Sequence, residues 1–174
     1  MFDDFTDESR VWVFAARDRL STDTAEKFSA LFAPFVADWK AHEVPVRGDF
    51  NIVHDLFLLV CADGKAAVPT GCSIDGLFKA VRAASTESGA NFDVRPEIYF
   101  RNGENICCVT SQEFKKLCSQ GKISPDTIVF NNSITKLSDL KNNRWETELK
   151  NSWHYKKFGK LIEGADGDKN RPNL

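Results

Sequence analysis

The chain has 174 residues, of which 42% are hydrophobic and 28% are charged, and its formal net charge is −2 at pH 7. These values are close to the averages of globular proteins and exclude a mostly disordered or low-complexity chain. A nearly neutral chain also differs from the strongly basic proteins that coat nucleic acid. The length suits one ordinary domain or two small ones.

The sequence shows no signal for export and no spacing typical of a metal site. Its first ten residues, MFDDFTDESR, lack the basic start and the apolar stretch of a secretory signal. Its longest apolar run, residues 56–62, is far shorter than the ~20 residues that span a membrane. The five cysteines contain no CxxC pair. We therefore expect a cytoplasmic protein with reduced thiols, no metal, no cofactor and no membrane partner.

The first elements in chain order are a strand and a helix. Residues 10–16 form a short apolar run rich in β-forming residues, which predicts a strand. Asp23 and Glu26 form a capping-box pattern, and apolar residues recur behind them at helical spacing. The pattern predicts a helix that is kinked at Pro34 and ends near His42.

The next elements predict an antiparallel sheet. Residues 50–62 indicate two strands with a turn near His54, the second of them apolar throughout and therefore buried on both faces. Gly71 opens a second helix, and Gly89 caps its C-terminus. A strand at residues 92–100 would complete the order β-α-β-β-α-β. This order predicts an α+β protein with a ferredoxin-like split βαβ core, whose two helices cover one face of the sheet.

The second half of the chain begins with a hairpin signal. Asn102-Gly103 favours a type I′ turn, because that turn needs positive φ at both central residues. It would join strands at residues 98–101 and 106–110. A short helix with a Thr-x-x-Glu capping box and a strand at residues 126–130 follow.

The same part of the chain resembles a known small module. The matching segments are Ile98-Tyr-Phe-Arg-Asn-Gly103, Thr110-Ser-Gln-Glu-Phe-Lys-Lys-Leu117 and Gly121-Lys-Ile-Ser-Pro-Asp-Thr-Ile-Val-Phe130. They resemble the bacterial variant of the GYF domain, which recognises proline-rich peptides, and Trp145 stands about where that family often has a closing Trp. The resemblance implies Tyr99, Phe130 and Trp145 as binding residues. Cys107-Cys108-Val109 replaces the family's Gly-Pro-Phe turn and the first aromatic pair is reduced to Tyr99-Phe100, so the resemblance implies the small fold without a peptide-binding aromatic cradle.

These patterns predict three parts of the chain. Residues 1–95 form the ferredoxin-like core, and residues 96–158 form a GYF-like subdomain that packs on it. Residues 159–174, rich in Gly, Asp and Asn, bury too little apolar surface and are predicted to be a disordered tail.

The whole chain is also similar to a set of small bacterial proteins of unknown function. The shared motifs are Arg10-Val-Trp, Gly71-Cys-Ser-Ile-Asp75, Val129-Phe-Asn-Asn132 and Ser152-Trp-His154. Those proteins often carry the label "ABC transporter ATPase". The residues here do not support the label, because a Walker A loop needs G-x-x-x-x-G-K-[ST] to hold phosphates. Leu77-Phe78 follow Gly76 where the Lys and the Ser or Thr would stand.

Cys72 is the best candidate for chemistry. It lies at a predicted helix N-terminus, where unpaired amides and the helix dipole stabilise a thiolate. A cysteine nucleophile also needs a base, and His54 is the nearest candidate along the sequence. Asp63 and Asp75 are candidate binding residues beside the same loop. The structural alternative, which is favoured, makes Cys72 a small buried side chain while Ser73 caps the helix.

The charge is divided unevenly along the chain. Residues 1–95 carry 10 basic and 15 acidic residues, whereas residues 96–174 carry 13 and 10. Basic residues alternate with aromatic ones between Lys141 and Lys160, a pattern that can bind single-stranded nucleic acid or an acidic protein. The favoured alternative is an arm whose Trp residues pack against the N-terminal sheet and whose lysines lie in water.

The sequence contains no complete catalytic set, so it favours a non-catalytic protein that binds a protein or peptide partner. An open sheet face would also suit a homodimer, and nucleic acid is not an expected partner. The competing prediction is a small cysteine-dependent enzyme, or a redox or ligand-binding protein, that uses Cys72.

Overall fold

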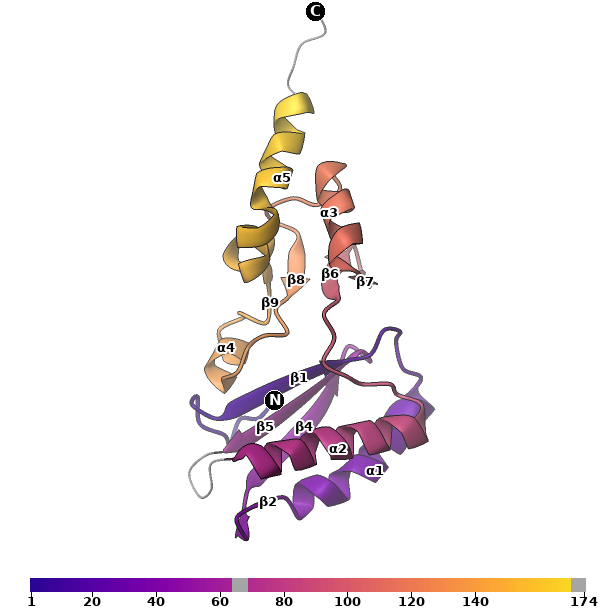
Figure 1. Cartoon of the computed structure of the whole chain (residues 1–174), viewed down its shortest axis with the longest axis vertical. Helices are drawn as coiled ribbons and strands as arrows, with labels where there is room; N and C mark the ends of the chain where they lie inside the picture. The colour runs from indigo at the N-terminus through magenta and orange to yellow at the C-terminus, as the bar shows by residue number, and fades with distance from the viewer. Residues whose placement is uncertain (64–68, 170–174) are drawn as a thin grey trace, which may run out of the picture. The chain divides into compact units, whose positions relative to one another are not determined.

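The computed structural model describes residues 1–63 and 69–169 of the chain. It is a mixed α+β structure with antiparallel sheets, as predicted (Figure 1). The chain forms two compact units. Unit 1 comprises Met1–Arg95 and Asn132–Lys141, and unit 2 comprises Pro96–Asn131 and Asn142–Leu174.

Unit 1 has a three-stranded sheet in the order β1-β5-β4 and a two-stranded sheet formed by β2 and β3. Its elements are β1 (Arg10–Ala15), α1 (Thr22–Ala37), β2 (Lys40–Ala41), β3 (Val44–Pro45), β4 (Arg47–Val53), β5 (Phe57–Asp63), α2 (Gly71–Ser88) and α4 (Leu137–Lys141).

The central strand β5 is buried along its whole length. It pairs antiparallel with β1 on one side and with β4 on the other, in the registers Trp12↔Val60 and Phe50↔Val60. Both edges of β5 are therefore paired, and the burial of its apolar run FLLVCA requires a cover on each face of the sheet. The two strands and the turn expected at residues 50–62 are confirmed, and His54 and Asp55 both have positive φ there.

Helices α1 and α2 lie together on one face of this sheet (Figure 1). Aromatic rings make the contacts. Phe32 of α1 lies 5.0 Å from Phe50 of β4, and Phe78 of α2 lies 5.1 Å from Phe14 of β1, each in an edge-to-face arrangement. Such pairs stabilise a core beyond the area they bury.

The opposite face of the sheet is covered by residues from both ends of unit 1. Arg47 of β4 stacks over the ring of Phe5 at 4.6 Å and donates a hydrogen bond to the Asp4 carbonyl. Lys141, at the end of α4, donates to the carbonyl of Phe5 and forms an ion pair with Asp7 at 2.8 Å. The segment 132–141 therefore returns to unit 1 and joins its N-terminal residues.

The outer side of β1 is bridged at two points. Ala15 pairs with Asp93, and Arg10 pairs with Lys136. The fourth strand expected from residues 92–100 is therefore wrong in its extent: only Asp93 bridges β1, and the chain re-enters strand structure at Ile98, in the sheet of unit 2. Pro96, which cannot donate a backbone hydrogen bond, lies between the two.

Helix α1 differs from its prediction at both ends. Its N-cap is Ser21, whose hydroxyl accepts from the Thr24 N–H, so the cap is two residues earlier than the Asp23 pattern indicated. The helix ends at Ala37 rather than near His42. Pro34 lies in the last turn of α1. The chain then enters the β2–β3 hairpin after Ala37.

Unit 2 is built on a four-stranded antiparallel sheet in the order β7-β6-β8-β9. Its elements are β6 (Ile98–Asn102), β7 (Asn105–Val109), α3 (Ser111–Ser119), β8 (Ile128–Phe130), β9 (Glu146–Glu148), the 3-10 turn η1 (Leu149–Asn151) and α5 (Trp153–Lys169).

The core of unit 2 lies between one face of its sheet and the helices α3 and α5. Phe114 of α3 contacts Phe158 of α5 at 5.1 Å and Phe100 of β6 at 5.5 Å, both edge to face. The capping box predicted for α3 is confirmed: the Thr110 N–H donates to Glu113, and the Glu113 N–H donates to the Thr110 hydroxyl. The buried cluster comprises Ile98, Phe100, Phe114, Cys118, Ile123, Val129, Leu149, Phe158 and Ile162.

Two predictions for this part of the chain need correction. The hairpin is present, but its two-residue loop is Gly103-Glu104, since Asn102 pairs with Asn105. Of the two loop residues only Gly103 has positive φ, which is the pattern of a II′ turn. The tail expected from residue 159 is helical as far as Lys169, because Phe158 and Ile162 anchor α5 in the core. Residues 170–174 of that expected tail lie outside the described residues.

No helix within the described part of the chain is both long and apolar enough to cross a membrane.

A substitution at Gly48 tests the packing of unit 1. A Cβ at this position would lie 2.9 Å from a ring carbon of Trp39, whose indole N–H is held by the Ser73 carbonyl at 3.1 Å. We expect Gly48→Ala to lower the free energy of unfolding by about 1–3 kcal/mol, because the buried ring has little room to move. Urea denaturation measures this. Gly71→Ala, which meets nothing within 4 Å, is the control; equal stability of the two variants would contradict the packing described.

His154 makes the stability of unit 2 depend on pH. It is 2% exposed, its Nδ1 lies 3.1 Å from the Ser152 hydroxyl, and burial together with the charge of Lys157 lowers its pKa from 6.5 to about 4. Between these values the unfolded chain binds a proton that the folded chain does not. The contribution of neutral His154 to the free energy of unfolding is fully present above pH 6.5, and it is lost as the pH falls towards 4.

We expect the free energy of unfolding of unit 2 to fall by about 2 kcal/mol from pH 7.5 to pH 5 through His154 alone. Urea titrations at both pH values measure it, and His154→Asn is the control in which this part of the pH dependence disappears. The same slope in both proteins would show that His154 is not held neutral.

Candidate functional site

The structure does not bring Cys72 and His54 together. Cys72 is the second residue of α2 and its side chain is exposed. His54 lies in the β4–β5 turn, where β5 begins, whereas α2 follows the other end of β5. The seven residues of β5 separate the two ends by about 20 Å at ~3.3 Å per residue. His54 therefore cannot serve as the base for Cys72 in this structure.

Thr70 and Ser73 are hydrogen-bonded to each other at the start of α2. The Thr70 N–H donates to the Ser73 hydroxyl at 2.8 Å, which in turn donates to the Thr70 carbonyl at 3.0 Å. Thr70 is the N-cap residue, and Ser73, which was expected to be the cap, is its partner in the first turn. Asp75 is exposed on the same helix.

Asp63 ends the buried strand β5 and is itself 3% exposed. Its carboxylate lies 3.8 Å from a guanidinium nitrogen of Arg47, its register partner on β4. Burial, strengthened by the charges of Asp49 and Asp63, raises the pKa of the neighbouring Cys61 thiol to about 12. Throughout residues 1–63 and 69–169, no group of three or more His, Cys, Asp or Glu side chains could hold a metal ion.

The three aromatic residues expected to contact a peptide are buried. Tyr99 is 0% exposed, Phe130 2% and Trp145 5%. Tyr99 and Phe130 alternate with the core residues of β6 and β8, so they lie on the sheet face away from α3 and α5. Phe130 contacts Trp145 edge to face at 5.3 Å, and the Arg101 guanidinium lies over the Phe130 ring. These residues do not form an exposed aromatic surface.

The edge strand β7 is the feature of unit 2 best suited to contact a partner. It has a strand neighbour on one side only, in the order β7-β6-β8-β9 (Figure 1). Its sequence, NICCV, contains no charged residue and no proline, and four of its five side chains are half-buried. Free strand edges are usually protected by charge, proline or a bulge.

The other edges of the two main sheets carry such protection. On the outer side of β1, Asp93 and Lys136 form bridges. Strand β4 carries Arg47 and Asp49, and β9 has the sequence ETE. Strand β7 is therefore the uncharged edge among these four.

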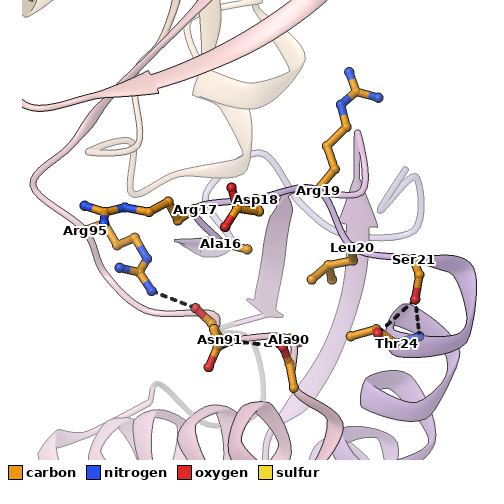
Figure 2. A pocket seen from close by; sticks show the side chains of 11 residues that line it. Ala16, Arg17, Asp18, Arg19, Leu20, Ser21, Thr24, Ala90, Asn91 and Arg95 are labelled. Carbon is orange, nitrogen blue, oxygen red and sulfur yellow. Dashed lines mark hydrogen bonds between the residues drawn. The ribbon is translucent and has the colours of Figure 1, made fainter.

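Unit 1 has a pocket that none of the predicted site residues lines. It has a volume of about 560 Å³ and lies where the chain enters α1 and where it leaves α2 (Figure 2). Arg17, Arg19 and Arg95 are among its lining residues. Arg95 is far from Arg17 and Arg19 in the sequence, so no local motif indicates this pocket.

Comparison with known proteins gives no relative: no family model, no curated protein and no solved structure matches the chain.

The cysteines differ in access, and alkylation of the native protein tests this. Cys72 is exposed, whereas Cys61 and Cys118 are buried and burial raises their pKa values to about 12 and about 11. We expect iodoacetamide at pH 8 to modify Cys72 first and to leave Cys61 and Cys118 unmodified until urea unfolds the chain. Peptide mass spectrometry locates the labels, and Cys72→Ser is the control. Early labelling of Cys61 would contradict the buried strand β5.

Proposed function

We propose that the chain is a non-catalytic binding protein whose unit 2 recognises an extended peptide segment of another protein by strand addition to β7. The uncharged edge of β7 is the observation that supports this function. A peptide that pairs with an exposed strand gains backbone hydrogen bonds for affinity and uses alternate side chains for specificity.

The register of the hairpin supports this geometry. Asn102 and Asn105 flank the two-residue loop, so they form a hydrogen-bonded pair, and pairs of this kind alternate along an antiparallel ladder. The backbone groups of Ile106, opposite Arg101, then point to the outer side of β7. A peptide strand would pair there, beside the half-buried side chains of Ile106, Cys107 and Cys108.

The peptide would carry small or apolar side chains at alternate positions. Alternate side chains of an added strand fall on the same sheet face as those of its neighbour. In β7 these neighbours are Ile106 and Cys108 on one face and Cys107 and Val109 on the other, and none is charged. A charged side chain directly beside them would lose solvation without gaining a partner.

The arrangement of elements supports the finer fold assignments as parts of this proposal. In unit 1, β5 lies between β1 and β4, which matches a ferredoxin-like split βαβ order up to α2. In unit 2, a hairpin, a helix and a strand follow one another in the order of a GYF-like module. The separation of Cys72 from His54 supports the non-catalytic assignment.

A peptide selection tests the proposed function. The full chain is used to select binders from a display library of random peptides, and amide hydrogen exchange then locates the bound peptide. We expect protection of the amides in residues 105–109. Ile106→Lys should lower the affinity of the chain for the selected peptides by about tenfold or more, because it places a charge on the edge of β7.

Thr147→Lys on the opposite edge strand β9 is the matched control, and it should leave the affinity unchanged. Ile106→Pro, which removes one outward N–H, is a second variant in case the lysine disturbs the hairpin. Strand addition at β7 would be refuted if the peptides protected the amides of other segments from exchange. Equal affinity of the peptides for the Ile106 variants and for the parent chain would also refute it.

A further inference from the structure

The pocket in unit 1 has two guanidinium groups at one end, those of Arg17 and Arg95 (Figure 2). Residues 16–21 lead from β1 into α1 on one side, and residues 89–95 follow the end of α2 on the other. Figure 2 shows Arg17 and Arg95 together at one end of the pocket and Ser21 and Thr24 at the other, with the side chain of Arg19 directed away. Its volume of about 560 Å³ is within the usual range for small-molecule sites.

Arg95 is held in place by the backbone. Its Nε donates to the Ala15 carbonyl at 3.1 Å, and one terminal nitrogen donates to the Asn91 carbonyl at 3.0 Å (Figure 2). A guanidinium has five N–H donors in a fixed planar fork, so these two bonds orient the group and leave donors for a ligand. An oriented fork matches the oxygens of a phosphate or a carboxylate.

Two carbonyl oxygens that would repel an anion at the pocket accept hydrogen bonds from side chains. The C-terminal end of α2 presents carbonyl oxygens at the pocket, which oppose negative charge. Here the Asn91 carbonyl accepts from Arg95, and the Gly89 carbonyl accepts from the Asn91 side chain at 3.1 Å. Both oxygens therefore already have donors.

The positive charge of the pocket comes from its arginines rather than from the end of a helix. The first turn of α1 is closed by its own residues: the Ser21 hydroxyl accepts from the Thr24 N–H and donates to the Thr24 hydroxyl. Arg17 and Arg95 lie together at one end of the pocket, Arg19 is directed away from it, and Asp18 is the one carboxylate among the lining residues (Figure 2). Both arginines belong to the acidic part of the chain, residues 1–95, which carries 10 basic and 15 acidic residues.

We propose that this pocket binds a small organic dianion, a phosphate ester or a dicarboxylate. The oriented fork of Arg95 contacts the oxyanion, Arg17 adds a second positive charge at the same end, and the hydroxyls of Ser21 and Thr24 face the polar remainder of the ligand. This site lies in unit 1 and is independent of strand addition at β7.

Isothermal titration calorimetry on the full chain at low ionic strength tests the proposal. The probes are glycerol 3-phosphate, succinate and inorganic phosphate, and the first two distinguish the two ligand classes. We expect one of the organic dianions to bind more tightly than inorganic phosphate, with an affinity that falls as sodium chloride is added. Equal binding of all three would overturn the organic ligand, and no binding at millimolar concentration would overturn the site.

Three substitutions locate the binding. Arg17→Gln and Arg95→Gln should each lower the affinity for the dianion by about tenfold, the effect of losing one charge-assisted contact. Arg82→Gln, which removes the same charge from the exposed side of α2, is the matched control and should have no effect. An equal loss in all three variants would show general charge screening and refute the pocket. Arg17→Gln leaves the two backbone hydrogen bonds of Arg95 in place, so it stays informative if Arg95→Gln unfolds.

Discussion

The burial of β5 is the constraint on which unit 1 depends. A strand with seven buried residues needs a pairing partner at each edge and a cover on each face. Strands β1 and β4 supply the edges, and the aromatic sides of α1 and α2 supply one cover. The N-terminal residues and the segment 132–141 supply contacts on the other face through Phe5, Arg47 and Lys141. Burial within the same strand also raises the pKa of the Cys61 thiol.

Local patterns predicted the elements well where the signal was periodic or carried by a specific turn residue. The apolar run of β5, the capping box at Thr110 and the C-cap at Gly89 all correspond to the structure. The errors lie where tertiary contacts override local preference. Residues 92–100 have strand-forming side chains, yet they split between two sheets at Pro96. Residues 159–169 carry the polar composition of a tail, yet they continue α5, whose Phe158 and Ile162 lie in the core of unit 2.

The candidate sites were harder to predict than the fold because sites depend on distances across the chain. The sequence placed Cys72 and His54 close in number, whereas the length of β5 separates them in space. Tyr99, Phe130 and Trp145 have the residue types of a peptide site, but all three are buried, and alternation along β6 and β8 places the first two on the sheet face away from α3 and α5. Arg17 and Arg95 line one pocket beside the bridge between Ala15 and Asp93, a long-range contact that no local pattern encodes.

The return of the segment 132–141 to unit 1 has a consequence for how the chain is made. Domains generally fold in order from the N-terminus as they emerge during translation. Here Val11 finds the carbonyl of Thr135, and Ser9 finds the amide of Leu137, only after the hairpin and α3 of unit 2 have left the ribosome. The N-terminal unit is therefore the first to begin folding but cannot be completed before much of the second unit exists. The order of synthesis therefore makes completion of the N-terminal unit depend on synthesis of much of the second unit.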